Sequence, residues 1–196
     1  MTPDPLFDAD DAATPLTEEE KLGLIPSYIT LRRELNEAEQ AGILAAEEWA
    51  FSRRRNVLDE KFLRRLHKEM FKGAWKWAGD YRTTARNIGV DAYRIGPDLH
   101  QLLDDVRYWI KNSTYPPDEI AIRFHHRLVS IHPFPNGNGR HARLAADLLV
   151  ISLGRPRFTW GRGSIGDAGD IRHRYVVSLR AADGHNIEPL LSFARS

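Results

Sequence analysis

The sequence contains no cysteine and no long apolar run. Without cysteine there can be no disulfide framework, no thiolate zinc site and no cysteine nucleophile, and a reducing compartment is compatible with this absence. No stretch approaches the ~20 apolar residues that a membrane-spanning helix requires. The first residues, MTPDPLFDADD, lack the basic and apolar regions of a secretory signal. We therefore expect a cytoplasmic protein that makes no use of the membrane.

Lysine is also scarce, since only six of the 28 basic residues are lysine and 22 are arginine. Arginine recognises carboxylate and phosphate groups in a more fixed geometry than lysine does. The formal net charge of +1 hides an uneven distribution, because the first 20 residues carry seven acidic residues and no base. The rest of the chain carries 28 basic against 20 acidic residues, a net charge of +8. We interpret residues 1–20 as an acidic flexible arm in front of a basic body.

The pattern of apolar residues predicts an all-α fold. The length of 196 residues and the hydrophobic content of 42% suit one globular domain. Thr17 and Glu20 have the spacing of a capping box that begins a short helix. Apolar residues at three- and four-residue spacings predict further helices, at about 30–55, 59–72, 98–111, 118–131, 140–153 and 170–182.

One of these helices and one other segment stand out. Helix 140–153 is apolar on most sides, so we expect it to be buried at the centre of a helical bundle. Residues 81–95 have β-branched and aromatic residues around an Asn-Ile-Gly turn, which predicts a short β-hairpin. The chain then divides into the arm 1–20, a helical segment 21–50 and a core domain 51–196.

Residues 132–143, HPFPNGNGRHAR, carry the strongest chemical signal. A lone GNG is more often a plain turn between two helices. Here Gly137 and Gly139 allow the backbone N–H groups to converge on an anion, at the N-terminus of a helix whose dipole favours phosphate. Arg140 and Arg143 are three residues apart, so they share a face above this nest. Two guanidinium groups beside a helix N-terminus predict a polyphosphate ligand.

His132 lies at the other end of the same loop. Imidazole has an unperturbed pKa of about 6.5 and can accept a proton from a hydroxyl group near neutral pH. Beside a bound polyphosphate, it would activate an alcohol for attack on phosphorus. We therefore predict that His132 is a general base.

This segment resembles the motif of the Fic family, HxFx(D/E)GNGRxxR. The resemblance extends to WAGDYRTTARNIG at 77–89, which is similar to the stretch that leads into the flap hairpin of the family, and we extend it over roughly 50–190. The residues of this motif and of the upstream segment GLIPSYITLRRELNEAEQ are similar to those of the Fic subgroup called mobile mystery protein B. The all-α prediction agrees with the Fic fold.

The resemblance implies a protein adenylyltransferase that transfers AMP from ATP to a Ser, Thr or Tyr hydroxyl of a target protein. His132 would be the general base and Phe134 would anchor the loop. Gly137, Asn138 and Gly139 would cradle the phosphates, while Arg140 and Arg143 would hold the β- and γ-phosphates. The hairpin 82–95 would clamp the target by strand addition, and relatives often form homodimers.

One position departs from the motif, because Asn136 replaces the acidic residue that binds Mg²⁺ in the family. A carboxamide oxygen is still a hard ligand, and Mg²⁺ commonly uses phosphates and waters with one or two carboxylates. We therefore expect weaker binding of Mg²⁺ at Asn136 rather than loss of the chemistry.

Many Fic proteins are inhibited by a helix with the pattern (S/T)xxxE(G/N), whose Glu pairs with the second motif arginine. Thr30 and Glu34 match the first and last required positions, while Leu35 departs from the residue expected next. The pattern alone also fits an ordinary solvated helix. We predict autoinhibition through an ion pair between Glu34 and Arg143.

Two other functions remain open on the same fold. One is transfer of phosphate or another nucleotide, although the intact GNG and Arg140 favour AMP. The other is a catalytically weakened, nucleotide-binding regulator or toxin-like partner. We expect no nucleic-acid binding, because Arg53–Arg55 lack a recognition helix and interleaved aromatic residues.

Overall fold

The computed structural model describes residues 16–162 and 168–196. This part of the chain is helical, without a strand. Its elements, in chain order, are α1 (Glu18–Lys21), α2 (Arg32–Phe51), α3 (Glu60–Phe71), the 3₁₀ helix η1 (Ala92–Arg94), α4 (Ile95–Asn112), α5 (Pro117–Ile131), α6 (Asn138–Ser152), α7 (Ala168–Asp183) and α8 (Glu188–Arg195). None of the described helices is both long and apolar enough to cross a membrane. Most of the predicted acidic arm, residues 1–15, lies outside the described residues.

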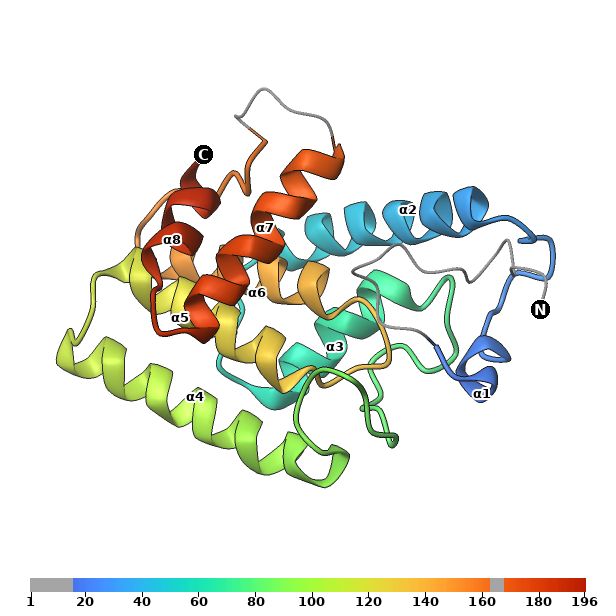
Figure 1. Cartoon of the computed structure of the whole chain (residues 1–196), viewed down its shortest axis with the longest axis horizontal. Coiled ribbons are helices and arrows are strands. Elements are labelled where there is room, and N and C mark those ends of the chain that lie inside the picture. The colour runs from blue at the N-terminus through green and yellow to red at the C-terminus, as the bar shows by residue number, and fades with distance from the viewer. Residues whose placement is uncertain (1–15, 163–167) are drawn as a thin grey trace.

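Helix α6 lies at the centre of the bundle, as its all-round apolar pattern predicts. It contacts α5, α3 and α2, and α7 and α8 pack together beside it (Figure 1). Three small residues on α6 are completely buried, Ala142, Ala145 and Ala146. Their short side chains let the neighbouring helices approach closely, which places the N-terminus of α6 deep in the fold.

Helix α2 is continuous through Gly42, where it packs closely against α3. A Cβ atom at Gly42 would lie 2.5 Å from the carbonyl oxygen of Met70 on α3. Because glycine has no side chain, the backbone of α2 at Gly42 can lie directly against the backbone of α3 at Met70. This close approach carries the buried face of α2 towards the centre of the bundle.

The structure differs from the sequence predictions in three places. Helix α4 begins at Ile95, three residues earlier than expected, and α8 was not predicted because it is only eight residues long. The predicted β-hairpin over 82–95 is wrong, since the described residues 82–91 form a loop before η1. The backbone N–H groups of Arg82 and Val90 donate to the carbonyl groups of Pro133 and Ile131, at 2.9 and 3.3 Å. These bonds join the loop to another segment instead of closing a hairpin across its own turn.

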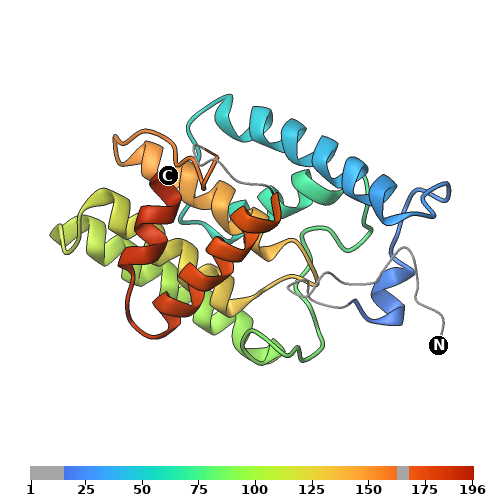
Figure 2. The same cartoon turned by 45° about the horizontal axis from the view of Figure 1, so that its top comes forward.

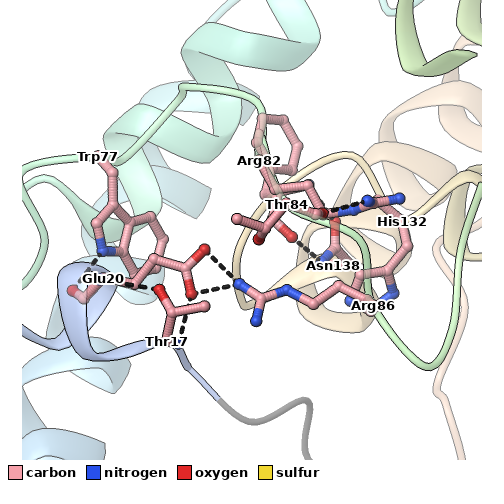
Figure 3. A network of polar contacts seen from close by, with 9 residues as sticks. Thr17, Glu20, Trp77, Arg82, Thr84, Arg86, His132 and Asn138 are labelled. Atoms are coloured by element: carbon pink, nitrogen blue, oxygen red, sulfur yellow. Dashed lines mark hydrogen bonds and ion pairs between the residues drawn. The ribbon is translucent and has the colours of Figure 1, made fainter. Parts of the chain in front are cut away.

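The end of the acidic leader is held against this loop. The expected capping box of Thr17 and Glu20 is present, with the Thr17 N–H donating to Oε2 of Glu20 at 2.8 Å. The carboxylate of Glu20 also forms an ion pair with Arg86, and the two side chains are only 13% and 7% exposed (Figure 3). Trp77 donates from Nε1 to the Glu20 carbonyl oxygen at 3.0 Å. Helix α1 is thus fixed at the edge of the 82–91 loop.

Replacing Glu20 with glutamine is expected to release α1 from the loop. Glutamine can preserve the capping box, but the buried ion pair with Arg86 is lost, and removing one member of such a pair costs about 3–5 kcal/mol. Amide hydrogen exchange of residues 16–25 and 83–88 should accelerate at least about tenfold. Glu19→Gln is the matched control, because Glu19 is exposed on the same turn. Equal exchange rates in the two variants would show that the ion pair does not hold α1.

Candidate active site

The loop 132–137 connects α5 to the buried N-terminus of α6, and both of its ends have left-handed backbone. His132 ends α5 with φ 54°, and Gly137 precedes α6 with φ 79°. Phe134, between them, is 1% exposed. The two reversals fold the loop tightly, so that His132 and the first N–H groups of α6 belong to one compact segment. Those first N–H groups have no partner within the helix and favour an anion.

Asn138 holds this loop closed through its side chain. Its Oδ1 accepts from the Phe134 N–H at 2.9 Å, and its Nδ2 donates to the Phe134 carbonyl oxygen at 2.8 Å (Figure 3). The side chain is buried, so both ends of the amide are used inside the protein. The predicted phosphate contact at Asn138 therefore falls to its backbone N–H group rather than to its amide.

His67, on α3, contacts the 132–137 loop. No role was predicted for it from the sequence. Its Nδ1 accepts from the Gly79 N–H at 3.0 Å, so the proton is on Nε2, which donates to the Asn136 carbonyl oxygen at 3.0 Å. The ring stacks on Phe134 with 3.8 Å between centroids. Burial, followed by the nearby His141, holds the pKa of His67 well below its ordinary value. A neutral His67 therefore fixes the end of the 132–137 loop, next to the N-terminus of α6.

His132 is 6% exposed and is neutral at physiological pH. Burial is the main cause that lowers the pKa of His132 to about 4, and the positive charges of Arg82 and Arg86 lower it further. A hydrogen bond with the Val129 backbone opposes the shift. An unprotonated imidazole is the form that can accept a proton, which is the role predicted for His132.

Arg140 has an unexpected partner in Glu39 of α2. The Glu39 carboxylate, 4% exposed, accepts from Nη1 of Arg140 at 2.7 Å and from Nε1 of Trp75 at 2.7 Å. Because a buried carboxylate needs both charge compensation and hydrogen bonds, this arrangement is stable only with Arg140 turned towards α2. The guanidinium predicted to bind phosphate is therefore held by an internal anion.

Glu34, the predicted partner of Arg143, is elsewhere. Its carboxylate accepts from the N–H groups of Thr30 and Leu31 at 2.9 and 3.1 Å, on the surface at the start of α2. These two backbone bonds lower the pKa of Glu34. A glutamate in the first turn of a helix is attracted to the free N–H groups there. The expected pairing of Glu34 with Arg143 is therefore not formed, and Thr30 binds the Glu34 carboxylate through its backbone N–H and its side chain.

Arg143 instead lies over the ring of Tyr175 on α7, with its guanidinium carbon 4.9 Å from the ring centroid. The Tyr175 hydroxyl is 3.1 Å from Nε2 of His125. A Cβ atom at Gly139 would lie 3.4 Å from the same hydroxyl. Arg143 is thus oriented by a buried aromatic ring next to the first turn of α6, and Gly139 leaves room for both.

Residues 57–150 match the sequence model of the Fic/DOC family. Residues 57–150 are thus a Fic/DOC domain, which covers just under half of the chain. Two curated relatives are the protein adenylyltransferase Fic of Aedes aegypti, 28% identical over 118 residues, and the protein adenylyltransferase fic-1 of Caenorhabditis briggsae, 32% identical over 120 residues. Each match covers 59% of this chain but 22% of the relative, so the chain spans about a fifth of their length.

The fold of the Fic domain is also that of solved structures. The crystal structure of BepC from Bartonella tribocorum with bound AMPPNP superposes with a TM-score of 0.68, over 91% of this chain and 97% of that one. The two sequences are 18% identical. The all-α Fic fold predicted from the motif is confirmed. Glu39 lies outside the residues that match the family model, because that match begins after α2.

Asn136 of the Fic domain offers one hard oxygen for a metal ion. Its Oδ1 accepts from the Gly137 N–H at 2.6 Å, and among the described residues no group of three or more His, Asp or Glu side chains is arranged to hold a metal. An amide oxygen has a second lone pair available for Mg²⁺. The residues therefore fit an ion bound mostly by nucleotide phosphates and water, with one neutral protein ligand.

Replacing Gly137 with alanine is expected to destabilise the Fic domain. A non-glycine residue at φ 79° costs about 1–3 kcal/mol, and the new Cβ would lie 2.5 Å from Cζ of Phe71. Urea denaturation should show the loss in the free energy of unfolding. Gly96→Ala is the control, because no atom lies within 4 Å of a Cβ at that position. Equal stability of the two variants would contradict the close packing of the phosphate loop.

Proposed function

We propose that this chain is a protein adenylyltransferase, which transfers AMP from ATP to a Ser, Thr or Tyr hydroxyl of a target protein. The proposal depends on one short loop, which has a buried neutral histidine at one end and, at the other, a helix N-terminus whose free N–H groups favour an anion. The matched relatives are protein adenylyltransferases in the insect and the nematode. Arg140 and Arg143 supply the charges that a triphosphate requires.

The proposed reaction moves one proton and one nucleotidyl group. His132 takes the proton of the target hydroxyl, and the oxygen attacks the α-phosphorus of ATP. The bond from the α-phosphorus to the bridging oxygen breaks, and pyrophosphate leaves with its charge compensated by Arg140, Arg143 and the N-terminus of α6. The product is a phosphodiester on the target, and the proton on His132 is released to solvent.

The low pKa of His132 is consistent with this role in the presence of nucleotide. In the structure the nearby charges on His132 are Arg82 and Arg86, and both are positive. The negative phosphates of ATP would oppose them and raise the pKa of His132 towards the working pH, where a general base is most effective. Binding of the substrate would thus increase the basicity of the imidazole.

We include Mg²⁺ in the proposed site, with Asn136 as its protein ligand. When bound, the ion would supply positive charge to the phosphates during transfer. The chain's own contribution is to hold Asn136 in place, and the hydrogen bond from His67 to the Asn136 carbonyl oxygen does this. We expect higher Mg²⁺ concentrations to be required than for a site with a carboxylate ligand.

We further propose autoinhibition, with Glu39 rather than Glu34 as the inhibitory residue. The ion pair of Glu39 with Arg140 has a nitrogen–oxygen distance of 2.7 Å and would have to break before Arg140 could bind phosphate. Trp75 fixes the carboxylate from the other side. The pairing therefore competes directly with ATP for the guanidinium, and it involves the first motif arginine instead of the second.

The target segment is proposed to dock along the 82–91 loop. Asn87, Ile88 and Gly89 are exposed there, and Gly89 lies next to His132. Docking through backbone groups would read the shape of the target rather than its side chains. We also propose that the protein forms a homodimer. The lack of cysteine supports a cytoplasmic location, and the residues of the motif support membership of the mobile mystery protein B subgroup.

Labelling with ATP radiolabelled on the α- or the γ-phosphate tests the proposal. Retention of the α-label alone, on the chain or on a target protein, supports AMP transfer. Retention of the γ-label would replace it with phosphate transfer. Nucleotide binding without any label, also for a Glu39→Gln variant, would favour a regulator in which Asn136 has weakened catalysis.

A further inference from the structure

Arg82 is a buried arginine that binds backbone carbonyl groups around His132. Arg82 is only 2% exposed. Nε donates to the His132 carbonyl oxygen at 2.7 Å, and Nη1 donates to that of Thr84 at 2.8 Å. Nη2 donates to the carbonyl oxygens of Val90 and, at 3.4 Å, Ile131. One guanidinium group therefore joins the two ends of the 82–90 loop to the segment that carries the base.

The backbone contacts between these two segments follow the same line. The Arg82 N–H donates to the Pro133 carbonyl oxygen, and the Val90 N–H donates to that of Ile131. At Gly89, φ is 93°, and a Cβ atom there would lie 2.6 Å from Cβ of His132 and 2.9 Å from Nη2 of Arg82. Gly89 thus lies directly against His132, and Figure 3 shows the Arg82 side chain close to His132.

The backbone conformation of His132 is one that this contact can stabilise. With φ 54°, His132 is in the left-handed region, a strained conformation for a residue with a Cβ that persists only where the surroundings impose it. The carbonyl oxygen of His132 accepts a hydrogen bond from Nε of Arg82 at 2.7 Å. The hydrogen bond from Nε of Arg82 holds that carbonyl group in place.

We propose that Arg82 is the positioning residue of His132: it fixes the backbone of the base and the target-docking loop relative to each other. A guanidinium group suits this task because its planar fork can reach several acceptors at once in fixed directions. Lysine carries the same charge but cannot reproduce that fork. The proposal rests on the function proposed for His132, but the contacts themselves do not depend on nucleotide.

The positive charge of Arg82 also affects the pKa of His132. Within the described residues, no carboxylate lies at ion-pair distance from Arg82; Asp91 and Glu20 act on it from farther away, and Arg86 opposes them. After burial, the charges of Arg82 and Arg86 are the causes that lower the pKa of His132, with the Val129 backbone opposing. Arg82 therefore helps to keep the base unprotonated until an anion arrives.

Two substitutions separate the geometric effect from the charge effect. Arg82→Lys keeps the charge and loses the fork, whereas Arg82→Gln loses both. Arg94→Gln is the matched control, because Arg94 is an exposed arginine in η1, just after this loop, and is paired with Asp98 at 3.1 Å. The measurements are the NMR titration of His132 and the amide exchange of residues 82–91, both on the full chain without nucleotide.

Arg82→Lys is expected to accelerate exchange at the Val90 amide about ten- to hundredfold, because hydrogen bonds from a charged donor are lost, and to leave the His132 titration low. Arg82→Gln is expected to accelerate exchange equally and to raise the His132 midpoint from about 4 towards its ordinary value. If Arg82→Gln fails to fold, Arg82→Lys alone decides. Exchange in Arg82→Lys at the rate of the Arg94→Gln control would overturn the proposal.

Enzymatic readouts distinguish this proposal from the proposed function. In a Glu39→Gln background, Arg82→Lys should lower the rate of labelling while the affinity for an ATP analogue stays unchanged. An equal loss of rate and nucleotide affinity would indicate general disorder of the site and contradict positioning. Absence of labelling in every variant would refute adenylyl transfer, and the titration and exchange results would still decide the role of Arg82.

Discussion

Replacing His132 with alanine is expected to reduce nucleotide transfer by a factor of about 10²–10⁴, the usual contribution of a positioned general base. The imidazole lies at the closed end of the phosphate loop and is unprotonated at neutral pH, because burial and two arginines lower its pKa to about 4. No other residue of that loop can accept a proton from the target hydroxyl. The rate of incorporation from α-labelled ATP measures the effect, and the affinity for an ATP analogue should change little.

The matched control is His126→Ala. His126 is on the same helix, but its Nε2 pairs with Asp183 at 2.8 Å, away from the loop. This variant should label at the rate of the unaltered chain. A folded His132→Ala protein that retains more than a tenth of that rate would exclude His132 as the base.

Replacing Glu39 with glutamine is expected to increase both nucleotide affinity and labelling at least about tenfold. Two unit charges about 4 Å apart attract by about 4 kcal/mol at an effective dielectric of 20, and ~1.4 kcal/mol corresponds to a factor of ten. Glutamine keeps an acceptor for Trp75 and lets Arg140, whose side chain is 32% exposed, turn towards phosphate. Titration calorimetry with a non-hydrolysable ATP analogue, together with labelling rates, measures the two effects.

Glu34→Gln is the control for this prediction. It removes the same charge from the same helix, but from a carboxylate that only caps the N-terminus of α2. Its nucleotide affinity should equal that of the unaltered chain. Activation by Glu34→Gln, with none by Glu39→Gln, would restore the inhibitory pair inferred from the sequence pattern and contradict the structural one.

The sequence did contain a signal for Glu39. The buried residues of α2 are Leu35, Glu39, Ile43, Ala46 and Ala50, so Glu39 falls in phase with the apolar stripe, whereas Glu34 does not. A glutamate on the buried face of a helix must have a cationic or hydrogen-bonding partner inside the protein. Pattern matching to (S/T)xxxE ignores this phase, and for that reason it selected the glutamate that caps the helix.

The parts of the fold that could be predicted depend on local signals. The buried character of α6 and the glycines at its start are both evident from adjacent residues, so the helix and its central position could be predicted. The course of residues 82–91 is decided by a distant segment, because Arg82 and Val90 bond to the backbone around His132. Residues with high β-propensity follow such tertiary contacts rather than their own preference. His67 was missed for a similar reason, since its partners Gly79 and Asn136 are brought to it only by folding.

AMP transfer at the loop between His132 and the N-terminus of α6 can be tested by intact mass spectrometry. The Glu39→Gln chain is incubated with ATP and Mg²⁺, with the Glu39→Gln, His132→Ala double variant beside it. We expect an adduct of one AMP on the first protein, or on a target supplied with it, and none with the second. An AMP adduct that persists without His132, or a phosphate adduct in its place, would contradict AMP transfer with His132 as the base.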